Sequence, residues 1–251
     1  MNIACFSDTH TKHGEWYNQL PDEIKLKFDE ADMLIHTGDF TEIGDYVSVD
    51  AFLTWFSKRP NKHKVLIAGN HDFYFDTDDT PKNRYNFPTT DLDVQDMLEK
   101  YPNIVYLNNA EVIIDGFKIW GSPTNKWFHD WAFNRHEGDD IKRYWDLIPE
   151  DTDILMTHGP AYGILDLCPQ GDKLVHLGDK DLLEAVQRVK PKLFCFGHIH
   201  EGYGLVTIDE DECEHTGIAV DNIGTIFVNA TCMNEIYKPK NPPIFVELEK
   251  L

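Results

Sequence analysis

The sequence predicts an α/β fold in which a parallel sheet is followed by antiparallel strands. Apolar, β-branched runs alternate with helical segments over roughly the first 70 residues. A polar group able to bind a metal follows each of the first three runs, at Asp8, Asp39 and Asn70, and successive groups are 31 residues apart. That interval suits one strand–helix–strand unit, so these groups are expected at one edge of a parallel sheet. Ligand sites of open α/β sheets lie at this edge, where the strands end.

Apolar spacing and turn residues predict the individual elements. Strands are expected over residues 2–6, 32–36, 64–68, 153–157 and 192–196, with antiparallel strands over 203–208, 224–229 and 244–248. Helices are expected over residues 22–30, 47–58, 91–100, 136–146 and 179–190. The Asp115-Gly116 turn between two apolar runs predicts a hairpin over 111–120, and segment 73–90 is expected to be a loop. Because no linker, repeat or low-complexity tract is evident, a single domain over residues 1–251 is expected.

Composition narrows the classes of partner. The chain has 251 residues, 41% of them hydrophobic, and a formal net charge of −21. A surface with this much negative charge argues against binding of nucleic-acid polymers or anionic membranes. Bound cations can still attract a small anionic substrate. The five cysteines form no Cys-x-x-Cys pair, and no apolar run approaches membrane-spanning length. A cytoplasmic protein with buried free thiols is therefore expected.

Segment 121–136 is rich in aromatic residues and has two interpretations. It can be a packed surface loop, or it can form a wall of a substrate pocket, because rigid aromatic side chains suit a base or ring.

Candidate metal ligands stand at the ends of five predicted strands. They are Asp8, His10, Asp39, Asn70, His71, His158, His198 and His200. Taken singly, an Asp after a strand can cap a helix, and a lone His is most often an ordinary polar residue. Their joint occurrence favours a metal site, because five separate strands each end in an imidazole, carboxylate or amide group that can bind a metal. Asp8-x-His10 and His198-x-His200 each place two ligands on the same side of an extended segment.

The motifs are similar to those of a known family. The order Asp-x-His, Gly-Asp, Gly-Asn-His-Asp, His-Gly and Gly-His-x-His, which spans residues 8 to 200, resembles the calcineurin-like metallophosphoesterase superfamily. The segments 35–42, 121–123, 131–134 and 197–204 further resemble its metallophosphoesterase-domain-containing subgroup. The likeness covers nearly the whole chain.

This resemblance implies a four-layer α/β/β/α sandwich of two mixed sheets with a dinuclear metal site at the strand ends. Carried over by motif, one ion takes Asp8, His10, Asp39 and His200, and the other takes Asp39, Asn70, His158 and His198. Asp39 then bridges the two ions. Some members of the subgroup lack the histidine that matches His198, so its presence implies a complete centre. Asp72 stands where many members have Glu, and it is expected to cap a helix or to orient neighbouring groups.

The resemblance also implies a phosphodiesterase. The mixed nitrogen and oxygen ligands suit Mn, Fe or Zn better than Mg or Ca, and two Mn ions are expected first. A hydroxide that bridges the two ions would attack nucleotide-like substrates, with cyclic nucleotides as the named example. Asn70 and His71 are expected to bind the phosphate, and His71 to donate a proton to the leaving group or a hydrogen bond to a phosphate oxygen. The Glu42 carboxylate is expected to orient His71.

Two other functions stay open. A phosphomonoesterase or protein phosphatase can use the same centre, although residues 38–42 lack the arginine that protein phosphatases carry in the equivalent motif. A non-catalytic scaffold is the remaining alternative. The motifs do not specify the oligomeric state.

Overall fold

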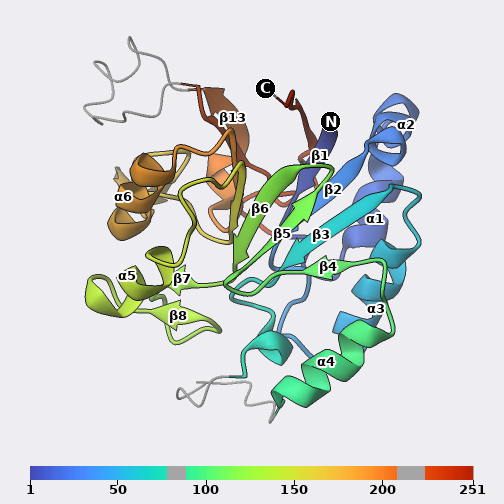
Figure 1. Cartoon of the computed structure of the whole chain (residues 1–251), viewed down its shortest axis with the longest axis horizontal. Helices are drawn as coiled ribbons and strands as arrows, with labels where there is room; N and C mark the ends of the chain where they lie inside the picture. The colour runs from blue at the N-terminus through green and yellow to red at the C-terminus, as the bar shows by residue number, and fades with distance from the viewer. Residues whose placement is uncertain (78–88, 208–223, 251) are drawn as a thin grey trace.

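Two mixed β-sheets lie face to face in the computed structural model, and helices cover their outer faces (Figure 1). The structure describes residues 1–77, 89–207 and 224–250, so most of the predicted loop 73–90 and the end of the predicted strand 203–208 lie outside the described residues. In the described part of the chain, no helix has the length and apolar character needed to cross a bilayer.

The first sheet has five strands in the order β15-β1-β2-β3-β4. They are β1 (Asn2–Phe6), β2 (Met33–Thr37), β3 (His63–Ile67), β4 (Val105–Tyr106) and β15 (Ile244–Glu247). Strands β1 to β4 are parallel, and β15 pairs antiparallel with β1. The carboxyl ends of β1 to β4 therefore lie at one edge of the sheet, as the 31-residue spacing of Asp8, Asp39 and Asn70 predicts.

The second sheet has six strands in the order β13-β14-β12-β9-β6-β5. They are β5 (Ala110–Ile114), β6 (Phe117–Ser122), β9 (Ile154–Thr157), β12 (Leu193–Phe196), β13 (Gly204–Thr207) and β14 (Ile226–Asn229). Its central strands are parallel, and β5 and β13 pair antiparallel at the two edges. The prediction for 224–229 was therefore wrong in one respect, because β14 is antiparallel to β13 but parallel to β12.

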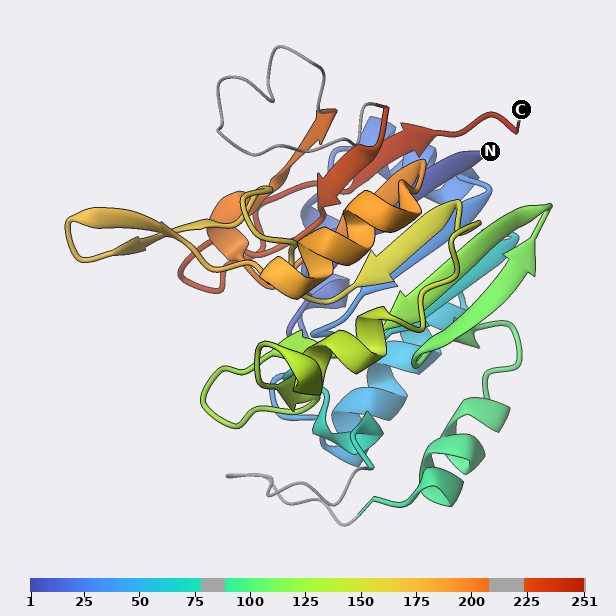
Figure 2. The same ribbon diagram turned by 60° about the vertical axis from the view of Figure 1, so that its left-hand side comes forward.

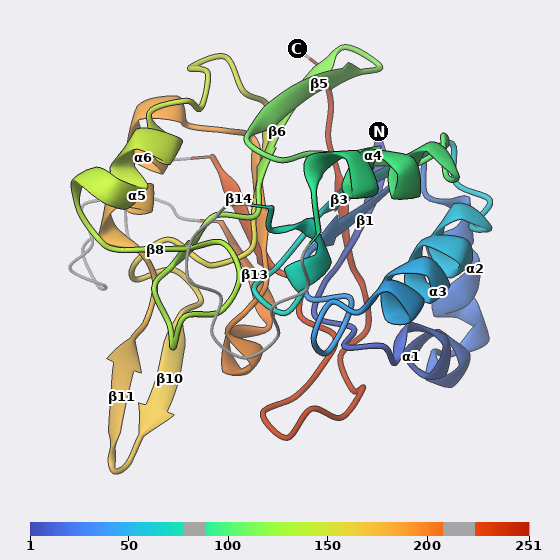
Figure 3. The ribbon, with the colours of Figure 1, turned by 90° about the horizontal axis from the view of Figure 1, so that it is seen from below.

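The helices lie on opposite sides of the paired sheets (Figure 3). They are α1 (His13–Gln19), α2 (Asp22–Glu30), α3 (Tyr46–Ser57), α4 (Asp91–Glu99), α5 (Asp139–Trp145) and α6 (Lys180–Val189), with short 3₁₀ turns η1 (Phe73–Phe75) and η2 (His200–Gly202). Two consecutive residues of β1 show the layering, because they point to opposite faces of the sheet. Phe6 packs in the core under the first four helices, and Cys5 packs between the two sheets. In β12, Cys195 faces that same middle core, and Phe194 packs in the core beneath α5 and α6. This arrangement confirms the predicted four-layer α/β/β/α sandwich and explains the continuous apolar runs, since central strands are buried on both faces.

Several smaller elements are absent from the sequence-based prediction. Among them are α1, β4, the short pair β7 (Asn125–Lys126) and β8 (Asn134–Arg135), and a two-stranded arm of β10 (Leu167–Gln170) and β11 (Lys173–His176). The arm projects from the body of the protein (Figure 2). Its sequence has no period-two apolar pattern and contains Pro169, so it gives no strand signal. The cysteines of the described chain are free, and Cys5, Cys195 and Cys232 are buried; Cys213 lies outside it.

Candidate metal centre

The predicted ligands come together at the shared carboxyl edge of the two sheets. Among the described residues, three groups of side chains have ligand atoms within 4.8 Å of one another: Asp8–His10–His200, His10–Asp39–His71 and Asp39–His158–His198. Asn70 joins the third group, because its Oδ1 lies 2.9 Å from His158 Nε2. The structure therefore brings every predicted ligand residue into one connected set.

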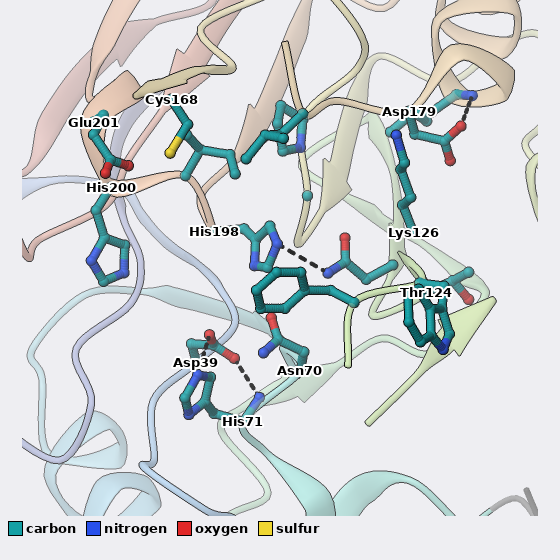
Figure 4. Close-up of a pocket in the computed structure, with 18 of the residues that line it drawn as sticks. Asp39, Asn70, His71, Thr124, Lys126, Cys168, Asp179, His198, His200 and Glu201 are labelled. Atoms are coloured by element: carbon teal, nitrogen blue, oxygen red, sulfur yellow. Dashed lines mark hydrogen bonds and ion pairs between the residues drawn. The ribbon is translucent and has the colours of Figure 1, made fainter. Parts of the chain in front are cut away.

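Asp39 lies at the middle of this set. Its Oδ2 is 3.2 Å from His158 Nε2 on one side, and 4.0 Å from His10 Nε2 and 3.9 Å from His71 Nε2 on the other. Its Oδ1 accepts a hydrogen bond of 2.8 Å from the main-chain N–H of His71. The carboxylate is thus fixed between two groups of imidazoles. Figure 4 shows it beside His71.

The turns that carry the ligands have unusual backbone geometry. Asp8, His10, Asp39 and His198 have φ values of 53°, 39°, 55° and 67°. Left-handed conformations at non-glycine residues cost on the order of 1–3 kcal/mol each and tend to cluster at functional sites. Four of them at one edge of the sheets indicate that these turns serve to place side chains.

Main-chain carbonyls orient two of the histidines. His158 Nδ1 donates to the carbonyl of Thr37 at 2.9 Å, and His200 Nδ1 donates to the carbonyl of Asn234 at 3.1 Å. Because a carbonyl only accepts, each ring carries its proton on Nδ1 there. In the neutral imidazole the lone pair is then on Nε2, which lies close to a carboxylate. A hydrogen bond at the other ring nitrogen fixes the tautomer and orientation of most metal-binding histidines in this way.

Burial and mutual charge set the protonation of the centre. Burial acts to raise the pKa of Asp39, but His158, His71 and His10 outweigh it and hold that pKa well below its usual range. Burial lowers the pKa of His10 to about 4 and that of His198 to about 3. His158 is the opposite case, because Asp39 overcomes burial and raises its pKa to about 9. At neutral pH, Asp39 is ionised and His10 and His198 are neutral, which are the forms that bind metals.

His10 tests whether this centre fits a cation. Its side chain is fully buried, and neither ring nitrogen has a hydrogen-bond partner among the described residues. Buried polar atoms without a partner are rare and costly. Together with the carboxylate, imidazole and amide donors around it, this imidazole indicates that these residues fit a bound metal cation.

Asp72 connects two of the ligand-bearing turns. Its carboxylate accepts hydrogen bonds from the main-chain N–H groups of Gly69 and Asp39, both at 2.8 Å, and of Thr41 at 2.9 Å. The Thr41 hydroxyl adds a bond of 2.7 Å. Asp72 precedes η1, but within the described chain its side chain makes no hydrogen bond that caps this turn. Of the two roles expected for Asp72, the structure supports the second, because its carboxylate orients the local main chain and does not cap the turn.

The orientation of His71 differs from the prediction. Its Nδ1 lies 2.7 Å from the main-chain carbonyl oxygen of Glu42, whose side chain is exposed. The partner residue is thus the expected one, but the carbonyl makes the contact and not the carboxylate. The Nε2 atom remains directed to Asp39. Since His71 also belongs to the group with His10 and Asp39, its ring lies within reach of a metal ion.

A cavity of about 370 Å³ opens beside the centre. Asp39, Asn70, His71, His198 and His200 line it, as do residues 124–128 of the aromatic segment (Figure 4). The aromatic segment therefore forms part of a pocket wall, which was one of its two interpretations.

Sequence reasoning missed several residues around the site. The Tyr237 ring lies 5.0 Å from that of His10 and 4.9 Å from that of His200, and Asn125 Nδ2 lies 3.4 Å from His198 Nε2. Trp131 packs against His71 with ring centroids 4.2 Å apart. The aromatic character of segment 121–136 was the one signal in the sequence for Asn125 and Trp131. The sequence around Tyr237 has no pattern that predicts its place at the site.

Comparison with known proteins identifies the family. The family profile described as calcineurin-like phosphoesterase matches residues 1–202, which include every predicted ligand. The chain belongs to this family. Metallophosphoesterase domain-containing protein 1 of Homo sapiens is 39% identical to this chain, over 98% of this chain and 70% of the human protein. A UPF0046 protein of Caenorhabditis elegans is 34% identical over 98% of this chain and 80% of the worm protein.

A solved structure supports the fold of this calcineurin-like phosphoesterase. TT1561 of Thermus thermophilus superposes with a TM-score of 0.54 at 14% identity, over 91% of this chain and 88% of that one. At this identity the similarity concerns the fold alone. The His and Asp groups at the sheet edge are the kind of candidate metal-binding cluster typical of dinuclear metallophosphoesterases.

Proposed function

We propose that this chain is a dinuclear-metal-dependent phosphodiesterase that hydrolyses nucleotide-like substrates, cyclic nucleotides among them. The central position of Asp39 supports the proposal most strongly. Its carboxylate belongs both to the group with His10 and His71 and to the group with His158 and His198. A carboxylate shared in this way can fix two cations at the separation of about 3.5–4 Å that two-metal catalysis uses.

The proposed ligand sets are those that the motifs imply. One ion is assigned to Asp8, His10, Asp39 and His200, and the other to Asp39, Asn70, His158 and His198. The short distances from His158 Nε2 to Asp39 and to Asn70, 3.2 Å and 2.9 Å, support the second set. Mixed nitrogen and oxygen donors favour Mn, with Fe and Zn as alternatives.

Two divalent cations bound here would neutralise the phosphate and supply an activated water as nucleophile. The protein's own part is to position the substrate and to move a proton. The Asn70 amide and the His71 imidazole lie at the cavity wall, where they can contact phosphate oxygens. With His71 Nδ1 donating to the Glu42 carbonyl, the imidazolium form of the ring can give its Nε2 proton to the leaving oxygen and is then left as the neutral Nδ1–H form.

The cavity suits an organic group attached to the phosphate. Trp127 and Phe128 line it and are 44% and 49% exposed, so their rings are available to a base or other flat group. Lys126 from the same segment also lines the cavity near Asp179 (Figure 4), and its ammonium lies 2.9 Å from Glu137 Oε1.

We also propose that residues 1–251 form one domain that acts in the cytosol. The pairing of β15 with β1 joins late and early parts of the chain in one sheet, and the free cysteines suit a reducing compartment.

Hydrolysis of bis(p-nitrophenyl) phosphate and of p-nitrophenyl phosphate by the Mn-loaded protein tests the proposal. We expect a clear preference for the diester, and His71→Ala should slow it by about 10²–10⁴-fold without loss of metal. Preference for the monoester would contradict the diesterase assignment. Fewer than one ion per chain after manganese supplementation would instead favour a non-catalytic scaffold.

A further inference from the structure

We propose that Trp131 is a positioning residue that holds the His71 imidazole in the orientation required for proton transfer to the leaving group. This inference rests on the proposed role of His71. The two rings lie with centroids 4.2 Å apart and an interplanar angle of 31°, so the indole covers one face of the imidazole. Trp131 is not among the described residues that line the cavity, so it would act on the reaction through His71.

His71 needs more than one restraint to be held in place. The hydrogen bond from Nδ1 to the Glu42 carbonyl fixes one ring atom, but the ring can still tilt about that contact. The indole face of Trp131 blocks tilting to one side. The His10 ring meets His71 nearly at a right angle, 84°, with centroids 4.7 Å apart, and restricts a different direction. Together these contacts leave Nε2 directed to the centre, 3.9 Å from Asp39 Oδ2.

Trp131 is itself attached to the segment that carries His71. The next residue, Ala132, donates its main-chain N–H to the carbonyl of Asn70 at 3.1 Å. Phe133 donates its N–H to Asp76 Oδ2 at 3.0 Å, and the Phe73 ring lies 5.6 Å from that of Trp131. The aromatic segment is therefore bonded to residues 70–76 at two points. Because the indole and the imidazole belong to one bonded unit, the indole can act as a fixed support.

The cost of losing that support follows from the geometry of proton transfer. A misplacement of about 1 Å can cost roughly 10²-fold in rate. Leu at position 131 keeps an apolar side chain but not a flat surface the size of an indole. We expect Trp131→Leu to lower kcat by about 10- to 100-fold when the leaving group needs a proton. The loss should be smaller for p-nitrophenolate, which leaves without much help.

The experiment compares methyl p-nitrophenyl phosphate with methyl phenyl phosphate for the Mn-loaded full chain. The quantity measured is the ratio of kcat for the two leaving groups, with metal content determined for each variant. His71→Ala and Trp131→Leu should both raise this ratio at unchanged metal content, and Trp131→Phe should restore a value close to that of the wild type. Phe133→Leu is the matched control, because Phe133 is a buried aromatic residue of the same segment. It should lower thermal stability and leave the ratio unchanged.

A second measurement does not depend on activity. In the metal-free chain, ¹⁵N NMR of His71 should show one sharp set of ring signals with the Nδ1 proton retained for the wild type, and exchange-broadened signals for Trp131→Leu. If His71→Ala raises the ratio but Trp131→Leu changes neither the ratio nor the spectrum, the positioning role is wrong and the proposed function stands. If His71→Ala itself leaves the ratio unchanged, the proton-donor role fails and the inference fails with it.

Discussion

The Nδ1 atom of His71 donates a hydrogen bond to the main-chain carbonyl oxygen of Glu42 at 2.7 Å. A main-chain acceptor has two consequences for the chemistry. It keeps the Nδ1 proton in place in both the neutral and the charged imidazole, so that only Nε2 exchanges protons with a substrate. It also does not depend on the identity of side chain 42, so the Glu42 carboxylate is not needed to orient the ring.

Replacement of Glu42 tests this consequence. Glu42→Gln should change kcat on a phosphodiester by less than about 3-fold, in the range of ordinary surface substitutions, because the carbonyl remains. His71→Gln, measured alongside it, should lose roughly 10²–10⁴-fold. A large loss in Glu42→Gln at normal metal content would restore the carboxylate as the group that orients His71.

Asp72→Asn should destabilise the protein and weaken its metal binding. In Asn the NH2 group replaces one carboxylate oxygen, so its donor hydrogens would face either the N–H groups of Gly69 and Asp39, which bond to Oδ2, or that of Thr41, which bonds to Oδ1. Loss of such buried bonds costs about 1–3 kcal/mol. Urea unfolding of the metal-free protein measures the change directly. Unaltered stability would mean that the two turns do not depend on this carboxylate.

Gly69→Ala should abolish metal binding. A Cβ at this position would overlap the main-chain nitrogen and Oδ1 of Asp39 and approach His158 Cε1 to 2.7 Å. Gly14→Ala is a matched control, since a Cβ there meets nothing within 4 Å and Gly14 lies in helix α1. Equal metal content in the two variants, determined by elemental analysis, would show that the close approach of Gly69 to Asp39 is dispensable.

Metal affinity should rise with pH up to about 9. Asp39 raises the pKa of His158 to about 9, so this imidazole is protonated at neutral pH in the metal-free protein. A ligand imidazole must be neutral, so the proton has to leave when the ion binds. Below pH 9 the affinity should therefore fall by roughly tenfold per pH unit. Calorimetric titration with Mn²⁺ in two buffers of different ionisation enthalpy should report about one proton released per chain near pH 7.5. Identical heats in both buffers would exclude this proton release.

The sequence was sufficient to predict that the proposed ligands lie together, because each of them stands next to a predicted strand. Asp8, Asp39 and Asn70 follow buried parallel strands, and the topology of such strands brings their ends to one edge. His158 and His198 follow strands of the second sheet in the same way. Neither the exact path of the loops nor any side-chain contact is needed to reach that conclusion.

The residues around the ligands could not be predicted in this way. Trp131 and Tyr237 reach the centre through irregular segments, which have no periodic pattern to fix their direction. The Glu42 carbonyl is a main-chain group that every residue type has, so the amino-acid sequence cannot reveal that it contacts His71. The role of Asp72 as an acceptor for several N–H groups likewise depends on how two turns meet in space.

The proposed chemistry depends above all on Asp39 being shared by two metal ions. Anomalous diffraction from crystals of the Mn-loaded protein would locate those ions. We expect two peaks on either side of the Asp39 carboxylate, about 3.5–4 Å apart, with Asp8, His10 and His200 around one, Asn70, His158 and His198 around the other, and His71 bound to neither. A single peak, or a peak coordinated by the His71 ring, would contradict this assignment.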